Sequence, residues 1–367
     1  MNRFVYKIAF SMVRGMKPAV ANEIINRLGS EQEFFTLPRT ALQSRLDFNG
    51  SIIDNDYRAE LLEKARAEME FIESNNVGCR YFTDSDYPAR LLECEDAPLL
   101  LYGTGNTDLN AAHMVSIVGT RNATAYGVNF INTLVDELAR KIDGLVIVSG
   151  LATGCDITAH RRAMQAGVPT IGIVAHGLDT LYPAEHRNYA AQMVRSGGMI
   201  LTDYPHGTRP HRGNFLARNR IVAGISDCVV VAESAAQRGG ALHTAKVAML
   251  YNRDVFALPG RTSDLYSGGC NALIRSNTAH LIENADDLIH AMCWTQRPAE
   301  GQQATMFPEL TGMQQDVVDY LRQNGEAQTN RMAIDLGIPV GQLMATLVEL
   351  EFNGMLLSLP GARYRLA

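Results

Sequence analysis

The chain has 367 residues, of which 46% are hydrophobic and 20% charged, and its formal net charge is −6. This length predicts two or three globular domains, and no apolar window is long enough to cross a membrane. The acidic total makes a broadly basic nucleic-acid binder improbable, but binding depends on local charge, so a basic site remains open.

The six cysteines are scattered singly, with no CxxC pair. This pattern argues against a disulfide scaffold or a zinc site and favours a reducing cytoplasm. The first 18 residues carry charges within their apolar stretch and lack a small-residue cleavage site, so we expect no signal peptide. We also expect no cofactor, no metal and no membrane partner.

Residues 1–78 are predicted to form a helical domain. "MKPAVANEIINRLGS" places Pro18 near a helix start and Gly29 at its end. "DYRAELLEKARAEMEFIESNNVG" predicts a second, longer helix that ends in an Asn-rich segment.

Residues 79–295 alternate short β-branched runs with helical patterns such as "AYGVNFINTLVDELARKI". Continuous apolar runs of this kind are typical of parallel strands buried on both faces. We therefore predict an α/β fold, an extended Rossmann-like doubly wound sheet. The runs are "PLLLYG", "MVSIVG", "LVIVSG", "PTIGIVAHG", "GMILTD", "DCVVVAE" and "DVFALPG".

Residues 296–310 are rich in Pro, Gln and Gly and predict a linker, and residues 311–367 predict a third unit. Three helical patterns followed by "MLLSLPGARYRL", turning at Pro360-Gly361, resemble a winged helix-turn-helix. The segment "VGQLMATLVELEFNG", which corresponds to the recognition helix of that motif, has Glu349 and Glu351 but no Lys or Arg. We expect this unit to mediate protein contact or regulation, since reading a duplex groove requires phosphate contacts.

Glycine-rich loops follow several predicted strands, at the sheet edge where ligands bind in such folds. Gly119-Thr120-Arg121 follows one strand, and "SGLATGCDITAH", beginning at Ser149, follows another. Gly239-Gly240, beside Arg238, precedes a helix starting near Ala241 that has Thr244 one turn inside. These loops are either anion cradles or tight strand-to-helix packing, and their number at one edge favours a site.

The stretch "RPHRGNFLARNRIVAGIS", residues 209–226, contains four arginines and no acid. On a helix, Arg218 falls on the apolar stripe of Phe215, Val222 and Ile225, and Arg220 falls roughly opposite. A desolvated arginine needs a partner, either a distant internal carboxylate or an external phosphate. The clustering with Arg121 favours phosphate for Arg218, whereas Arg220 is left with either a neighbouring phosphate or an internal carboxylate.

Catalytic patterns are sparse. Asp156 and His160 lie one helical turn apart, and we interpret Asp156 as a helix cap rather than as part of a metal or acid–base pair. Tyr182 either stacks on a base or packs in its loop.

Taken together, these motifs resemble the DNA-processing protein A family (DprA, also called Smf). The matching segments span about residues 80 to 292: "SIVGTR", "SGLATGCDITAH", "GLDTLYP", "LTDYPHGTRP", "FLARNRIVAGIS", "VVVAESAAQRGGALHTA", "VFALPG" and "GGCNALI". The N- and C-terminal regions also look like this family's flanking domains, a SAM or helix-hairpin-helix-like domain and a winged helix.

The resemblance implies a binding protein and not an enzyme. Such a protein would bind single-stranded DNA, protect incoming strands in natural transformation, help to load the RecA recombinase and act as a homodimer through its Rossmann-like core. Together with the loop chemistry, it implies these DNA-binding residues: Gly119, Thr120, Arg121, Gly150, Phe215, Arg218, Asn219, Arg220, Gly239, Gly240, Ala241 and Thr244.

The sequence departs from the family pattern at Leu216, where proline is usual, and at Ala217, where a basic residue is common. The departures put the strength of binding in question rather than its location. The alternative hypothesis is an enzyme acting on a nucleotide or nucleoside phosphate on a similar core, but "GGALHTAKV" lacks the proline, GT pair and glutamate of that motif. A second alternative, a transcriptional regulator using the winged helix, is disfavoured by the acidic recognition helix.

Overall fold

The computed structural model describes residues 3–236, 239–297, 310, 312–352, 355–359 and 361–366. The chain divides into two compact units, Met1–Arg297 and Pro298–Ala367, which are considered one at a time. Most of the predicted linker, together with Arg238 and Pro360, lies outside the described residues.

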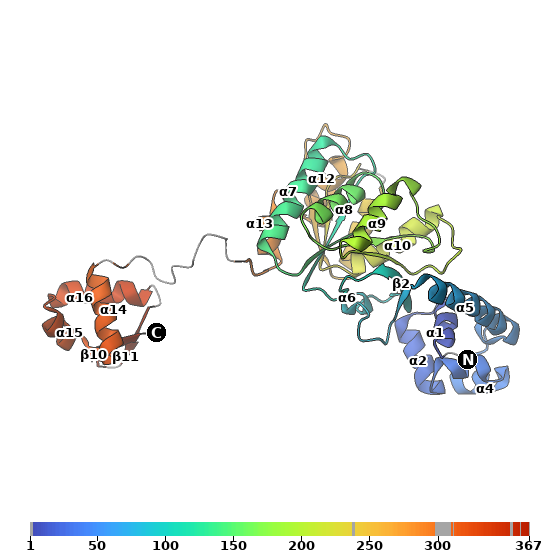
Figure 1. Cartoon of the computed structure of the whole chain (residues 1–367), viewed down its shortest axis with the longest axis horizontal. Coiled ribbons are helices and arrows are strands. Elements are labelled where there is room, and N and C mark those ends of the chain that lie inside the picture. Colours follow the sequence, from blue (N-terminus) through green and yellow to red (C-terminus); the bar gives the residue numbers. More distant parts are fainter. Residues whose placement is uncertain are drawn as a thin grey trace. The chain divides into compact units, whose positions relative to one another are not determined.

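The N-terminal region of the first unit is helical, as the sequence predicts (Figure 1). Pro18 occupies the first turn of its second helix, where no partner for the missing N–H is needed, and Gly29 ends that helix at φ 102°. The elements are α1 (Phe4–Ser11), α2 (Pro18–Leu28), α3 (Glu31–Thr36), α4 (Arg39–Leu46), the 3-10 turn η1 (Ser51–Ile53) and α5 (Asn55–Asn75).

A nine-stranded sheet follows, with the order β1-β2-β6-β5-β4-β3-β7-β8-β9. Each of the apolar runs identified in the sequence overlaps one of the strands β2 to β8. The short edge strands β1 and β9 were not foreseen. The strands are β1 (Gly78–Tyr81), β2 (Leu100–Gly105), β3 (His113–Val118), β4 (Leu145–Ser149), β5 (Thr170–Ile173), β6 (Met199–Thr202), β7 (Cys228–Val231), β8 (Asp254–Ala257) and β9 (His280–Leu281).

Strands β3 to β9 are mutually parallel, whereas β2 runs antiparallel to both β6 and β1. The prediction that "PLLLYG" forms a parallel strand is therefore wrong. Its residues Leu100 to Gly103 are buried because α1 and α9 (Arg187–Arg195) both contact the strand. An uninterrupted apolar run reports burial on both faces and not the direction of pairing.

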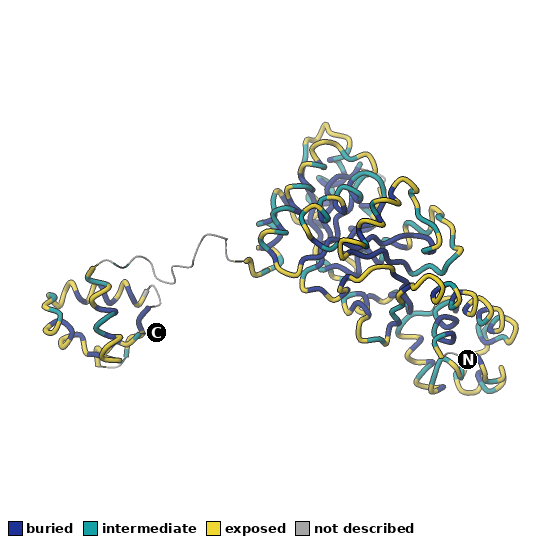
Figure 2. Tube along the Cα trace, in the orientation of Figure 1, coloured by how far each residue is buried: buried dark blue, intermediate teal, exposed yellow. Residues whose placement is uncertain are grey.

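Helices cover both faces of the sheet, and the buried strands appear as its dark centre in Figure 2. Along β3, Val115 and Ile117 belong to one core and Met114 and Val118 to the other, as the two-residue period requires. The first core takes in α7 (Ala125–Lys141), α8 (Cys155–Gln165) and α13 (Ala285–Ala291), and the second α10 (Arg212–Gly224), α11 (Gly240–Leu250) and α12 (Gly268–Arg275). Short helical turns occur at α6 (Ala89–Leu92) and η2 (Ala184–His186).

The N-terminal helices share the second of these cores. Buried Phe10 and Phe34 belong to the same apolar cluster as Tyr102 of β2 and Met199 of β6. The helical region is thus packed onto the sheet within one compact unit.

The second unit contains the three predicted helices and a three-stranded antiparallel sheet with the order β10-β12-β11, of which β10 was not foreseen. Its core includes Leu321, Met332 and Leu347. The elements are α14 (Gly312–Asn324), β10 (Glu326–Gln328), α15 (Thr329–Leu336), α16 (Val340–Phe352), β11 (Leu356–Leu359) and β12 (Arg363–Leu366).

In the described ranges, no single helix is both long and apolar enough to span a membrane. The pair formed by Thr329–Leu336 and Val340–Glu351, bent by 115°, meets that length and composition only when taken together.

Candidate nucleic-acid interface

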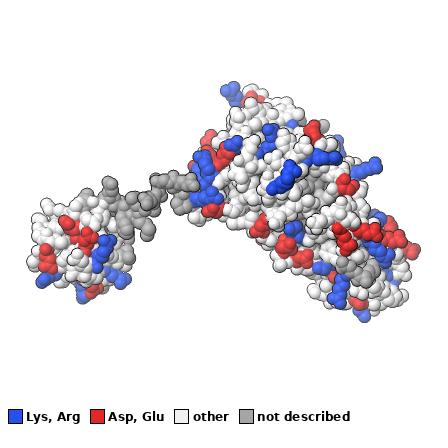
Figure 3. All heavy atoms as spheres, in the orientation of Figure 1, with Lys and Arg blue, Asp and Glu red and all other residues white. Residues whose placement is uncertain are grey.

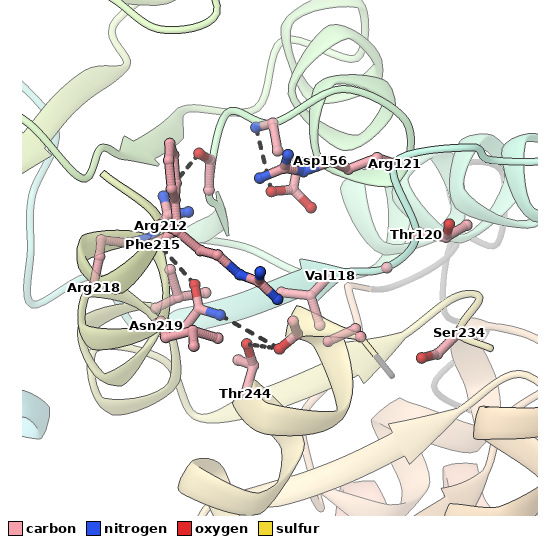
Figure 4. A pocket seen from close by; sticks show the side chains of 18 of the residues that line it. Val118, Thr120, Arg121, Asp156, Arg212, Phe215, Arg218, Asn219, Ser234 and Thr244 are labelled. Carbon is pink, nitrogen blue, oxygen red and sulfur yellow. Dashed lines mark hydrogen bonds between the residues drawn. The ribbon is translucent and has the colours of Figure 1, made fainter. Parts of the chain in front are cut away.

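A cavity of about 930 Å³ opens beyond the carboxyl ends of β3, β4 and β7. Strand β3 lies between β4 and β7, so the chain leaves it in one direction and returns on its other side. This is the switch point at which open α/β sheets bind ligands. Figure 4 shows Arg212, Phe215, Arg218 and Asn219 on α10, near the loop that carries Arg121.

Eleven of the twelve candidate residues line this cavity, and Arg220 does not. The loops after β3 and β4 and the start of α11 therefore meet at one place. The lining residues are Val118, Gly119, Thr120, Arg121, Gly150, Ala152, Asp156, Tyr182, Pro210, His211, Arg212, Phe215, Leu216, Arg218, Asn219, Val222, Ser234, Ala235, Gly239, Gly240, Ala241, Thr244 and Tyr266.

Gly150 is required by a close approach in the wall of the cavity. A Cβ atom at this position would lie 2.6 Å from Nη2 of Arg218 and 2.7 Å from Oδ2 of Asp156. Any side chain here would displace two buried charged groups, so the small loop lets an arginine and a carboxylate converge under the cavity floor.

Arg218 is only 4% exposed and is held from inside the fold. Its Nη1 donates to the carbonyl oxygen of Gly150 at 2.7 Å and to that of Ile173. Burial lowers the pKa of Arg218 to about 10, opposed by the charge of Asp156. The sequence favoured an external phosphate over a distant internal carboxylate for Arg218; the structure adds internal carbonyl partners, which come from strand ends distant in the sequence.

Arg220 also has an internal partner, one of the two alternatives left by the sequence. Its Nη2 lies 2.5 Å from Oδ2 of Asp203, and its Nη1 donates to the carbonyl oxygen of Asp96 at 2.5 Å. Burial raises the pKa of Asp203 while Arg220 opposes the rise. Arg220 is not among the residues that line the cavity, and its contacts with Asp203 and Asp96 agree with the internal carboxylate, one of the two alternatives.

The exposed part of the cavity combines cations with aromatic rings. The guanidinium of Arg121 lies 5.5 Å from the centre of the Phe215 ring. The centres of the Phe215 and Tyr182 rings are 5.6 Å apart, and the two ring planes are inclined by 54°. His211 accepts a hydrogen bond from the backbone of Gly213 and so caps the helix that carries Arg212. These groups offer both charge and stacking surface.

Asp156 contributes the single carboxylate among the lining residues, and it is 8% exposed. It is not the helix cap that we expected, because Gly154 occupies that position. Burial raises the pKa of Asp156, and Arg218 opposes the rise. Three arginines thus share the wall with one buried acid, although the chain as a whole is acidic. In Figure 3, acidic and basic side chains are interspersed over the visible face of this unit.

His160 lies outside the cavity and is fully buried. Its Nδ1 lies 2.7 Å from the hydroxyl of Thr170, and burial lowers the pKa of the ring to about 3. A histidine kept neutral inside the sheet has a structural place rather than an acid–base role. No group of three His, Cys, Asp or Glu residues that could hold a metal occurs in the described part of the chain.

Sequence reasoning did not name Arg212, Asp156, Ser234 or Tyr266 as site residues, although the cavity includes them. Arg212 belonged to the acid-free stretch, so its charge was a usable signal. Tyr266 follows β8 by nine residues and reaches the cavity only because the intervening loop folds back.

Residues 79–293 match the family model described as DNA recombination-mediator protein A. The chain belongs to this family. It is 31% identical to Protein Smf of Synechocystis over 98% of both chains, and 39% identical to DNA processing protein DprA of Streptococcus pneumoniae over 56% of this chain and 71% of that protein.

Solved structures of the family agree with this fold. The X-ray structure of DprA from Streptococcus pneumoniae superimposes with a TM-score of 0.63 at 31% identity, covering 79% of this chain and 97% of that one. DNA processing protein A from Helicobacter pylori, whose structure concerns its single-stranded DNA binding mode, gives 0.52 at 33% identity and covers 59% and 95%. The large α/β sheet is therefore a family feature.

Proposed function

We propose that this protein is a recombination mediator that binds single-stranded DNA in the cavity at the β3–β7 switch point. The observation that carries the proposal is the row formed by Arg121, Phe215 and Tyr182. The Phe215 ring lies 5.5 Å from the Arg121 guanidinium and 5.6 Å from the Tyr182 ring. Single strands are held by this chemistry, since arginines contact phosphates and rings stack on unpaired bases.

The residues that line the cavity have different parts in this proposal. Arg121 and Arg212 contact phosphates, Phe215 and Tyr182 stack on bases, and the backbone amides at Gly119 and Gly239–Gly240 contact further phosphate oxygens. Arg218 and Asn219 form the wall behind them. Arg220 supports the helix from the far side.

We infer from family membership that the protein helps to load RecA, protects incoming strands in natural transformation, and forms a homodimer through its Rossmann-like core. We also infer a SAM or helix-hairpin-helix-like N-terminal domain and a winged-helix C-terminal unit. A cytoplasmic location agrees with six free cysteines. The proposal includes no catalytic step, since Asp156 and His160 are both buried and hydrogen-bonded.

The test measures fluorescence anisotropy of a labelled oligothymidylate over a salt series, with duplex DNA of equal length beside it. Wild type is compared with Arg121→Ala and Arg212→Ala. Each loss of a phosphate contact should weaken binding and reduce the salt slope by about 0.7.

Arg195→Ala is the matched control. Arg195 is an exposed arginine at the end of α9, next to the amino end of β6 and thus at the opposite edge of the sheet. Preference for duplex, or unchanged binding in both cavity variants, contradicts the proposal.

A further inference from the structure

A second cavity, of about 270 Å³, lies between the first half of α7 and the segments that follow β8 and β9. Phe130, Leu134 and Leu258 are each at most 8% exposed and supply apolar surface. Its polar lining residues are Asn129, Thr133, Glu283 and Asn284. Tyr126 completes the lining and is 49% exposed.

This cavity is at the same edge of the sheet as the first. Leu258 directly follows β8, and Glu283 follows β9, so both mark carboxyl ends of parallel strands. The first cavity lies beyond β3, β4 and β7, and β8 and β9 are the next strands in the order. The two cavities therefore lie beyond neighbouring strands at one edge of the sheet.

Two loops contribute residues to both cavities. The loop after β3 gives Arg121 to the first and, at the start of α7, Tyr126 to the second. The loop after β8 gives Leu258 to the second and Tyr266 to the first. Between them, the amide of Asn122 donates to the hydroxyl of Tyr266 at 3.2 Å.

We propose that this second cavity is a nucleobase site on the same DNA strand, with Tyr126 as its stacking platform. The inference rests on the proposed function, because it concerns the path of the strand that the first cavity holds. An exposed aromatic beside an apolar floor with amide and hydroxyl groups suits a base, which has flat faces and polar edges.

The position of the Tyr126 ring is fixed. Its hydroxyl donates to the carbonyl oxygen of Pro259 at 2.7 Å, so the ring is held at the mouth of the cavity. Exposed Arg261 lies two residues further along that loop and is available to a phosphate between the two bases.

Glu283 determines which base the second cavity takes. A carboxylate repels phosphate but accepts a hydrogen bond from the exocyclic amine of cytosine, which thymine lacks. The second site therefore prefers cytosine to thymine.

The experiment compares oligothymidylates of about four and about twelve nucleotides, lengths within the range that one binding fold covers. Tyr126→Ala should leave affinity for the short strand unchanged and weaken the long strand roughly tenfold. Tyr126→Phe is the matched control, since it keeps the stacking ring and removes only the hydroxyl that holds it, and it should bind the short strand as wild type does and lose much less affinity for the long strand than Tyr126→Ala. Thermal melting of both variants checks the fold.

The affinity ratio of oligocytidylate to oligothymidylate should be roughly fivefold higher for the long strands than for the short strands. Glu283→Ala should abolish this difference. Equal losses on short and long strands, no loss on either, or equal behaviour of Tyr126→Ala and Tyr126→Phe overturn the proposal. If Arg121→Ala still weakens binding of single strands in those cases, the proposed function is retained. Failure of wild type to bind any single strand removes both.

Discussion

The carboxylate of Glu68 lies 2.6 Å from Nδ1 of His206 and also accepts the backbone N–H of that residue at 2.9 Å. One turn before the end of α5, Phe71 stacks on the His206 ring with centroids 4.9 Å apart and planes inclined by 13°. The loop that contains His206 leads into α10 and Arg212. The N-terminal helical region therefore holds the loop that leads into one wall of the main cavity.

Burial raises the pKa of Glu68 above its usual 4.5, and hydrogen bonds from His206 oppose the rise. The folded protein then holds this proton more tightly than the unfolded chain. The contribution of Glu68 to stability is accordingly greatest below pH 4.5 and falls as the pH rises through the folded value. The melting temperature of Glu68→Gln relative to wild type should rise from about pH 4 to about pH 7. A difference in melting temperature that stays constant over this pH range contradicts the raised pKa of Glu68.

The ion pair of Arg220 with Asp203 predicts a loss of stability separate from DNA binding. Arg220→Ala leaves a buried carboxylate without its cation and should lower the free energy of unfolding by about 3 kcal/mol. Urea unfolding measures this loss. Below the transition, the folded variant should bind single strands as wild type does, whereas weakened binding by fully folded protein would place Arg220 in the site.

The buried hydrogen bonds of Arg218 predict that its substitution lowers the stability of the protein. Arg218→Ala removes the donor from two buried carbonyl groups and should destabilise the protein by about 1–3 kcal/mol. Arg218→Lys should recover little of this loss, because a point ammonium does not replace a planar fork. Exposed Arg121 provides the contrast, since Arg121→Ala should weaken binding at unchanged melting temperature. Equal melting of all three variants would contradict the buried role of Arg218.

The second unit predicts the outcome of a truncation. Residues 311–367 contain six acids and four arginines, a net charge of −2, and the range of α16 contains Glu349 and Glu351 but neither Lys nor Arg. Removal of Pro298–Ala367 should leave the affinity for single strands unchanged in an anisotropy titration. The excised unit should not bind duplex DNA at physiological salt, and duplex binding by it would show that it reads grooves.

Much of the fold could be predicted from local patterns. Apolar runs such as "LVIVSG" located the buried strands, and Pro18 and Gly29 marked a helix at both ends. The gathering of Arg121, Phe215 and Gly239 followed from the rule that parallel strands end at one edge. Each of these inferences needed only neighbouring residues and one rule about the sheet.

The errors concern partners that are distant in the sequence. The Gly150 and Ile173 carbonyls that hold Arg218 precede it by 68 and 45 residues. Glu68 and His206 are 138 residues apart. The antiparallel direction of β2 depends on which strand it neighbours. Composition and period do not encode such pairings, because they arise only when the chain folds on itself.

The pairing of β1 with β2 has a consequence for dividing the chain. The family match begins at residue 79, inside strand β1, whose Gly78 already pairs with Gly103. Truncation of the chain at residue 79 would shorten the edge strand β1 and remove α1, which contacts β2. Tyr102 would then be exposed, because it shares an apolar core with Phe10 of α1. The boundary of the family match therefore falls inside a compact unit that runs from Met1 to Arg297, so a different N-terminal helical region would have to cover the same apolar face of β2.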